Sequence, residues 1–343
     1  GKSKEKMSKK VVSCIENTIK FINEFETKND EDITSFGIID THIHLWNVNT
    51  IKREWLLLDD FKELNKTLDL NEYFKMYNNQ KIYLKHGVFM ETDPIRSDID
   101  KEINEITLLC KDKNNNLKNI IAKLDANMKP ELFKKEILKY KDHTYIKGFR
   151  KVMFYDEPKP NETEYYLQNN FITNLTELNN SGIKLTFDLC GNIRTLKNVY
   201  KLIDLTPNIT YIIDHMGNHH EMNNKDYIKY DIWVKILYKL ATYNNVNIKL
   251  SGLMGAQRGG SLNERWSFDI QKNRINFILK IFNHNNIVYG SDWPVCTMSL
   301  DDNNKHDLVK LYTYPLFKFI QNHYGIHICQ KIFITNPQRI YNL

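Results

Sequence analysis

Residues 37–44 read GIIDTHIH. An apolar run that begins at a glycine and passes into histidines is typical of a buried parallel strand with functional groups at its carboxyl end. His42 and His44 are two residues apart, so in a strand their side chains point to the same side. The segment therefore predicts a strand that brings two imidazoles to one end of a sheet.

Seven further apolar segments of strand length follow, with helical patterns between them. Eight βα units over about 250 residues match a closed parallel barrel, whereas an open doubly wound sheet more often has five or six strands. The turn after the first segment reads LWNV, without the glycines of a dinucleotide site, and no GxxxxGK[ST] motif occurs. The expected strands are Gly37–His44, His86–Glu91, Asn119–Asp125, Tyr145–Lys151, Ile183–Cys190, Ile209–His215, Val246–Ser251 and Asn286–Asp292.

We therefore expect an α/β protein, a (β/α)8 TIM barrel over residues 37–343 with an N-terminal helical extension and C-terminal helices. Residues 1–36 are predicted to be a basic tail and a helix, because apolar residues recur at helical spacing from Lys9 to Glu26. The other expected helices are Ile99–Cys110, Glu131–Tyr140, Asn170–Asn179, Thr195–Leu205, Tyr227–Tyr243, Arg274–Phe282, Asp307–Asn322 and Ile326–Phe333.

Composition excludes several classes of protein. The 343 residues carry a net charge of +6, of which the first ten residues contribute +4, and no basic stripe continues beyond them, so we expect no nucleic-acid partner. No apolar stretch reaches about 18 residues, and the first thirty residues lack the apolar core of a signal peptide. Five widely spaced cysteines without a CxxC pair indicate reduced thiols. We expect a cytoplasmic protein that makes no membrane contact.

Four polar residues at the ends of expected strands are candidate metal ligands. His42 and His44 end the first strand, His215 ends the sixth and Asp292 ends the eighth. Three imidazole nitrogens and a carboxylate suit a divalent metal, with zinc favoured, and leave room for water. Asp292 and His215 are the expected catalytic residues, with Asp292 as general base. The alternatives are hydrogen-bonded structural histidines and an ion pair between Asp292 and a neighbouring cation.

Other polar residues at strand ends are candidate substrate contacts. Arg150 offers a planar fork to a substrate carboxylate. Glu91 and Asp188 either line the barrel mouth or form hydrogen bonds inside it, and His219 either reaches a ligand or is solvated. The expected substrate-binding residues are Arg150, Glu91, Asp188, His219 and Trp293.

Five motifs together resemble one family. They read DTHIHLW (40–46), IIDHMG (212–217), KLSGL (249–253), YGSDWPV (289–295) and NPQRIY (336–341). In this order they are similar to motifs of the TIM-barrel amidohydrolase superfamily, and more narrowly of its amidohydrolase-2 branch. That branch includes sugar-lactone and 2-pyrone-4,6-dicarboxylate lactonases and, more distantly, metal-dependent decarboxylases.

The resemblance implies roles for several of these residues. His42 and His44 correspond to the metal-site pair of the first strand, His215 to the histidine of the sixth, and Asp292 to the catalytic carboxylate. Arg150 corresponds to an arginine that meets a substrate carboxylate or hydroxyl. Some lactonases of the branch work without a bound metal, so metal-independent catalysis by the same residues stays open.

The expected activity is metal-assisted hydrolysis of a small lactone of a sugar acid or a carboxylated ring, by water that Asp292 deprotonates. The first alternative is metal-dependent nonoxidative decarboxylation of an aromatic or muconate-type acid, with His219 or His220 as proton carrier. The second is a catalytically silent barrel with a binding role. The partner in each case is a small molecule, and the sequence leaves homo-oligomer formation open.

Overall fold

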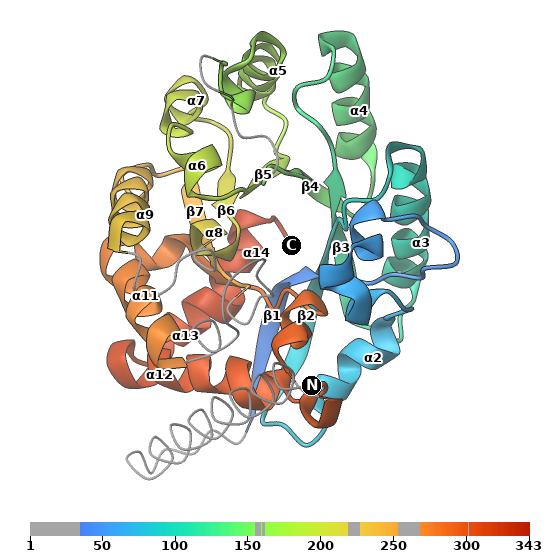
Figure 1. The fold of residues 1–343 in the computed structure, drawn as a ribbon, viewed down its shortest axis with the longest axis vertical. Helices are drawn as coiled ribbons and strands as arrows, with labels where there is room; N and C mark the ends of the chain where they lie inside the picture. The colour runs from blue at the N-terminus through green and yellow to red at the C-terminus, as the bar shows by residue number, and fades with distance from the viewer. Residues whose placement is uncertain (1–34, 155–158, 160–161, 219–226, 253–267, 301) are drawn as a thin grey trace.

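Eight parallel strands follow one another around a barrel in the order in which they occur in the chain (Figure 1). The computed structural model describes residues 35–154, 159, 162–218, 227–252, 268–300 and 302–343. The strands are β1 (Phe36–Ile43), β2 (Ile82–Met90), β3 (Leu117–Lys123), β4 (Ile146–Val152), β5 (Thr186–Cys190), β6 (Tyr211–Ile213), β7 (Val246–Leu250) and β8 (Ile287–Tyr289). The barrel closes between β8 and β1, where the Asp292 amide donates to the His42 carbonyl at 2.9 Å and the His44 amide to the Trp293 carbonyl at 2.8 Å. The predicted TIM barrel is confirmed.

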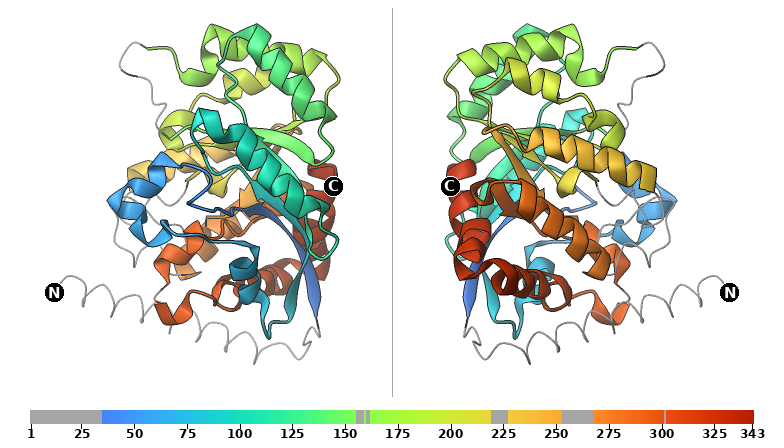
Figure 2. Two further views of the ribbon diagram at one scale, coloured as in Figure 1. Left: turned by 90° about the vertical axis from the view of Figure 1, so that its right-hand side faces the viewer. Right: turned by 90° about the vertical axis from the view of Figure 1, so that its left-hand side faces the viewer.

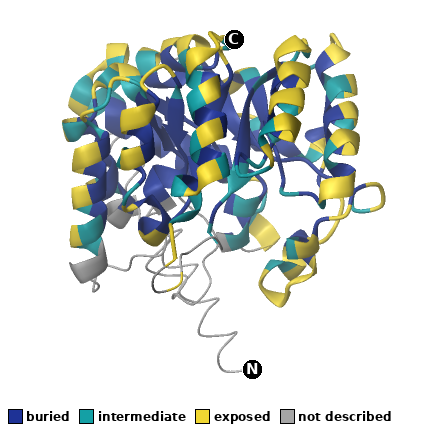
Figure 3. Cartoon of the chain, turned by 90° about the horizontal axis from the view of Figure 1, so that it is seen from above, coloured by how far each residue is buried: buried dark blue, intermediate teal, exposed yellow. Residues whose placement is uncertain are grey.

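The strands are buried on both faces, as their apolar sequences require (Figure 3). β2 is the exception, because buried Ile82 and Leu84 alternate with exposed Tyr83 and Lys85 before the strand enters the barrel. From the sequence this strand was expected to begin at His86, because residues 82–85 do not continue the apolar run. The amino-terminal half of β2 follows the alternating pattern of a strand with one solvated face.

A ring of helices surrounds the barrel, with buried residues facing the strands and exposed residues facing outward (Figures 1 and 3). In α3 the buried Ile103, Ile106 and Cys110 recur at the three- to four-residue spacing of one helix face. The longer surrounding helices are α3 (Ile99–Lys111), α4 (Pro130–Asp142), α5 (Asn169–Asn180), α9 (Tyr227–Leu240) and α11 (Phe268–Ile281). Each overlaps the helix that the sequence predicts there.

One predicted helix is divided. Thr195–Leu205 was expected to be continuous, but the structure has α6 (Ile193–Leu196) and α7 (Tyr200–Leu205). A capping box between Asn192 and Thr195 starts α6. The Asn198 amide then donates to the Tyr166 hydroxyl at 3.2 Å instead of continuing the helical ladder, so a side chain from another element ends the first helix.

The connection from β1 to β2 contains short helical elements that the sequence does not predict. These are 3-10 turns at Glu54–Leu57, Asp59–Leu64 and Lys75–Tyr77 and the helix α2 (Leu70–Phe74), which Asp69 caps by accepting from the Glu72 amide. The lengths are three to six residues, too short for helical periodicity to show in the sequence.

The C-terminal helices close one end of the barrel. They are α12 (Tyr314–Tyr324), α13 (Ile326–Gln330) and α14 (Asn336–Ile340), with π-helical turns at Val309–Thr313 and Lys331–Thr335. Phe36, at the amino end of β1, packs against Phe317 with ring centroids 4.5 Å apart and their planes tilted, and it also contacts Phe333. The C-terminal segment therefore lies at the amino ends of the strands, opposite His42, and Tyr341 inserts into the barrel interior. Figure 2 shows the same segment beside the start of β1.

The remaining sequence predictions concern membrane crossing, the cysteines and the N-terminal segment. Among the described residues, no helix has the length and hydropathy that a membrane crossing needs. The four cysteines in the described part of the chain are free and buried, as expected. The predicted N-terminal helix over residues 9–26 lies outside the described residues, and the division at residue 36 stays a prediction.

Candidate active site

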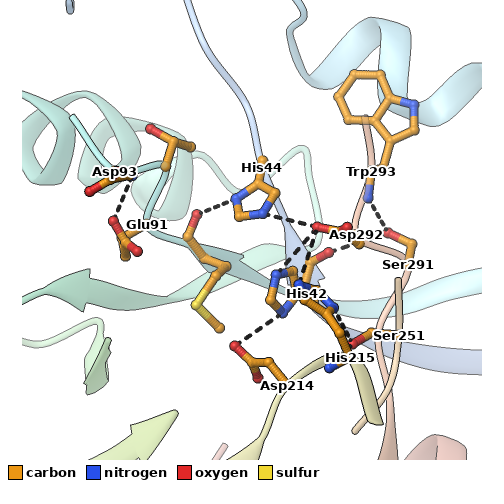
Figure 4. A network of polar contacts seen from close by, with 12 residues as sticks. His42, His44, Glu91, Asp93, Asp214, His215, Ser251, Ser291, Asp292 and Trp293 are labelled. Atoms are coloured by element: carbon orange, nitrogen blue, oxygen red, sulfur yellow. Dashed lines mark hydrogen bonds and ion pairs between the residues drawn. The ribbon is translucent and has the colours of Figure 1, made fainter. Parts of the chain in front are cut away.

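Three histidines and one carboxylate converge at the carboxyl ends of the strands (Figure 4). Oδ1 of Asp292 lies 3.2 Å from His44 Nε2, 3.5 Å from His42 Nε2 and 4.0 Å from His215 Nε2. The ring centroids of His44 and His215 lie 4.9 and 4.7 Å from that of His42. All four residues are buried. The structure thus brings together the complete ligand set predicted from sequence.

The backbone is bent into the left-handed region at two of these residues. His215 has φ 55° and Asp292 has φ 59°, although neither is a glycine. Conformations of this kind are rare for such residues and collect at functional sites, where surrounding contacts hold them. Around His215 these contacts come from Ser251, whose Oγ lies 3.0 Å from the His215 amide and 2.8 Å from Nδ1.

Gly252 packs directly against the His215 imidazole. A Cβ at this position would lie 2.8 Å from His215 Nδ1 and 2.9 Å from its Cγ, too close for any side chain. Gly252 also has φ 62°, which glycine adopts without steric cost. Ser251 and Gly252, which follow β7, therefore fix the position of the His215 imidazole at the end of β6.

Asp40 joins β1 and β8 below the histidines. Its Oδ1 accepts from the amides of His42 at 3.1 Å and Ser291 at 2.9 Å, and its Oδ2 accepts from the Tyr73 hydroxyl at 2.8 Å. Burial raises the pKa of Asp40, while these hydrogen bonds act in the opposite direction. One carboxyl group therefore holds in register the two strand ends that carry His42 and Asp292.

The geometry at His44 is suited to a cation. His44 Nδ1 lies 2.9 Å from the Met90 carbonyl oxygen, an acceptor, so Nδ1 carries a proton and donates it. His44 Nε2 lies 3.2 Å from Asp292 Oδ1, where it donates to the carboxylate if it carries a proton and offers a second ligand atom if it does not. A divalent ion would take Nε2 and Oδ1 as ligands, and the hydrogen bond from Nδ1 to a carbonyl is the usual outer-shell support of a metal-bound histidine.

Electrostatics influence the protonation of His42, His215 and Asp292. Burial, followed by the nearby Lys249, holds the pKa of His42 well below its usual range, and burial also lowers the pKa of His215. Burial alone would raise the pKa of Asp292, but His215 and His44 hold it below its ordinary value. Neutral imidazoles and an ionised carboxylate are the required ligand states. His42, His44 and Asp292 place ligand atoms within 4.8 Å of one another.

A network of buried ion pairs lies beneath the histidines. Arg150 Nε is 2.8 Å from Glu91 Oε1, and Arg150 Nη1 is 3.3 Å from Asp214 Oδ2. Lys249 Nζ is 3.0 Å from Asp188 Oδ2 and 3.5 Å from Asp214 Oδ1. Burial, then the adjacent Asp188, raises the pKa of Asp214 to about 7.

Negative charge exceeds positive charge in this region of the described chain. Five buried carboxyl groups face two buried cations; the groups are Asp40, Glu91, Asp188, Asp214, Asp292, Arg150 and Lys249. Unbalanced buried charge is costly, and proteins avoid it by pairing, by proton uptake or by binding a metal. Proton uptake at Asp214, whose pKa is about 7, removes part of the surplus, and a divalent cation at the histidines would balance the rest.

The predicted substrate-binding residues take several places. Glu91, Asp188 and Arg150 lie in the buried network, with each carboxylate on a protein cation. The Trp293 indole is 3% exposed, packs against Tyr73 and points away from the histidines (Figure 4). His219 and His220 lie outside the described residues. The contacts of these residues with substrate stay predictions.

Sequence reasoning did not assign Asp40, Lys249 or Tyr341 to the site. The signal for Lys249 was a charged residue inside a strand that is otherwise buried, VNIKL, because such a lysine needs an anionic partner. Tyr341 donates to both oxygens of Asp188 at 3.0 and 3.1 Å, and no local pattern predicts that contact across 153 positions.

Comparisons with known proteins agree with this geometry. The amidohydrolase family model matches residues 39–343. None of the curated proteins matches the sequence significantly. A zinc-bound amidohydrolase from Burkholderia multivorans has a similar structure, with a TM-score of 0.69 and 17% sequence identity over 90% of this chain and 100% of that chain.

Two other solved structures with the same fold have names that state a reaction. A probable 2-pyrone-4,6-dicarboxylic acid hydrolase from Acinetobacter baumannii, with citric acid bound, has a TM-score of 0.62 and 16% identity over 90% of this chain and 100% of that chain. A 2,6-dihydroxybenzoate decarboxylase from Rhizobium has a TM-score of 0.56 and 14% identity over 90% and 99%.

Proposed function

Because the chain belongs to the amidohydrolase family, we propose that it is a metal-assisted hydrolase that opens a small lactone of a sugar acid or a carboxylated ring. The family match establishes an enzyme of the amidohydrolase superfamily. The name of the Acinetobacter structure supports the finer assignment, since a pyrone dicarboxylate is a carboxylated cyclic ester.

The observation that carries the proposal is the convergence of His42, His44 and Asp292, whose ligand atoms lie within 4.8 Å of one another. A cation there would be held by His44 and Asp292, with His42 and His215 beside them, and nitrogen ligands with one carboxylate favour zinc among the common divalent ions. Such an ion supplies a Lewis acid and lowers the pKa of a neighbouring water.

The chain's own groups supply the remaining chemistry. Asp292 is ionised at neutral pH, because its pKa lies below the ordinary value, so it accepts the proton of the attacking water. His215, held by Ser251, presents a neutral ring that orients the ester carbonyl. Arg150 Nη1, 3.4 Å from His42 Nε2, is the guanidinium nitrogen that would pair with a substrate carboxylate in place of Asp214.

Nonoxidative decarboxylation is the second candidate, which the name of the Rhizobium structure supports. The same ligand set would bind a substrate carboxylate, and a protein acid would protonate the ring carbon that loses CO₂. The proposed proton carriers, His219 and His220, lie outside the described residues. Release of CO₂ from a hydroxybenzoate, against ring opening of a lactone, separates the two reactions.

Elemental mass spectrometry of the purified wild type and of the His42→Ala/His44→Ala variant, before and after chelation, tests the metal proposal. We expect about one equivalent of zinc or manganese in the wild type and none in the variant. The loaded enzyme is then screened against lactones and aromatic acids. A wild type that binds no divalent ion but opens lactones would overturn the metal assignment and leave metal-independent catalysis by Asp292.

A further inference from the structure

A second group of ligand atoms lies below the first. One nitrogen of His42 and carboxylate oxygens of Asp188 and Asp214 lie within 4.8 Å of one another, on the side of His42 away from His44. An arrangement of one imidazole and two carboxylates is suited to a divalent cation. In this protein the space among them holds the ammonium group of Lys249.

Lys249 Nζ contacts each of these three residues. It lies 3.0 Å from Asp188 Oδ2, 3.2 Å from His42 Nδ1 and 3.5 Å from Asp214 Oδ1, and it also donates to the Thr41 carbonyl at 3.1 Å. The lysine is completely buried. An ammonium is a compact point charge with three donors, so it fits a small cage of acceptors better than a planar guanidinium does.

We propose that Lys249 is a built-in cation that takes the place of a second metal ion and limits this centre to one divalent ion, held by His44 and Asp292. The inference rests on the proposed metal site. Lys249 acts as a positioning residue, because its ammonium donates to His42 Nδ1 and so leaves the ring proton on Nε2, which faces Asp292 Oδ1 at 3.5 Å.

Neighbouring residues stabilise the positive charge of Lys249 and leave room for its side chain. Tyr341 donates its hydroxyl to both oxygens of Asp188, and its ring centroid lies 5.3 Å from Lys249 Nζ, so the aromatic face also stabilises the positive charge. A Cβ at residue 290 would lie 3.1 Å from the Lys249 Cδ and 2.5 Å from the His42 Cβ, so Gly290 leaves room for both side chains.

The test counts manganese ions per chain. Full-length wild type, Lys249→Met and Lys249→Arg are equilibrated with excess Mn²⁺, freed of unbound metal and measured by elemental mass spectrometry. Lys249→Met has a similar length without the charge, and Lys249→Arg is the matched control that keeps it. The double variant Lys249→Met/Asp188→Asn also removes a carboxylate of the cage. Lys249→Gln replaces Lys249→Met if the methionine variant does not fold.

We expect one more equivalent of Mn²⁺ in Lys249→Met than in the wild type, and no gain in Lys249→Arg or in the double variant. Anomalous diffraction should place the extra ion between Asp188 and Asp214. We also expect Mn²⁺ to raise the unfolding temperature of Lys249→Met more than that of the wild type. Equal metal content in wild type and Lys249→Met or Lys249→Gln would overturn the inference.

The two proposals fail separately. The metal content of the wild type, one or none, tests the site at His44 and Asp292. The difference between wild type and Lys249→Met tests Lys249 alone. A wild type without metal beside a Lys249→Met variant with one ion would refute the first proposal and leave from the second only that Lys249 occupies a cation site.

Discussion

Two of the clusters of buried charge in the described part of the chain differ in balance: one is complete, with a cation for its carboxylate, and the other is not. Arg53 and Glu102 form an ion pair outside the barrel, with Arg53 Nη2 3.3 Å from Glu102 Oε2 and both side chains almost fully buried. Glu102 also accepts from the amide and hydroxyl of Thr92. This pair joins the segment after β1 to α3, and one cation balances one carboxylate.

The cluster inside the barrel differs in its charge balance and its acceptors. Its carboxyl groups outnumber Arg150 and Lys249, and ligand atoms of His42, His44 and Asp292 converge beside them. A complete buried ion pair costs desolvation energy and serves to fix structure, whereas a surplus of buried carboxyl groups favours uptake of a proton or a cation. The difference shows that burial of charge by itself does not identify a functional site. An excess of buried carboxyl groups over cations does.

The largest expected effect separates the two clusters by activity. Asp292→Asn removes the proposed base and a metal ligand, so we expect kcat/KM on a substrate found by the screen to fall about 10³-fold or more. Glu102→Gln, in the complete cluster, is the matched control and should stay within about threefold of wild type. Circular dichroism verifies that both variants are folded. Full activity in Asp292→Asn would remove it from the base role.

The second effect separates them by stability. Arg53→Met removes the cation of Glu102, whose carboxyl then takes up a proton, so we expect the free energy of unfolding in urea to fall by about 3 kcal/mol, the lower end for a broken buried pair. The metal content per folded chain should not change, because Arg53 does not contact the barrel histidines. Loss of metal with retained stability is the opposite pattern, and it would show that the two clusters are not independent.

The third effect is a pH dependence of the complete cluster. Burial, opposed by Arg53, raises the pKa of Glu102 from 4.5 to about 7 in the folded state. Between these values the folded state holds a proton that the unfolded state has lost, so stability falls as the pH rises. Relative to Glu102→Gln, we expect the wild type to lose about 3 kcal/mol from pH 4.5 to 7 and little above.

Urea unfolding of both proteins across this range measures the difference. Groups that do not interact with Glu102 titrate alike in the two proteins, so their contribution cancels. A difference between wild type and Glu102→Gln that stays constant with pH would show that Glu102 does not titrate in this way.

The smallest effect is the stabilisation of the folded protein by a cation that binds the cluster inside the barrel. Zinc at 100 times its dissociation constant should stabilise the metal-free wild type by about 2.7 kcal/mol, since it binds the folded state. His44→Ala should abolish this gain, and Arg53→Met should keep it. Calorimetric unfolding with and without zinc measures both, and an equal gain in His44→Ala would place the ion elsewhere.

Much of the site could be predicted because of the barrel's geometry. The carboxyl ends of parallel strands meet at one end of a barrel, so identifying strands that end in His42, His44, His215 and Asp292 was sufficient to bring those residues together. The same reasoning could not say that Arg150 and Glu91 pair with each other or that the Trp293 ring turns toward Tyr73. A position at a strand end does not specify which neighbour a side chain contacts.

The sequence by itself determined the order of strands and helices, the barrel and the four residues at its mouth, because these depend on local periodicity and on a repeated unit. Only the tertiary structure decided that Lys249 lies among His42, Asp188 and Asp214, and that Tyr341 reaches Asp188 from the C-terminal segment. Those contacts depend on the register between strands and on closure of the barrel. Both are set by packing over the whole chain, which no local pattern contains.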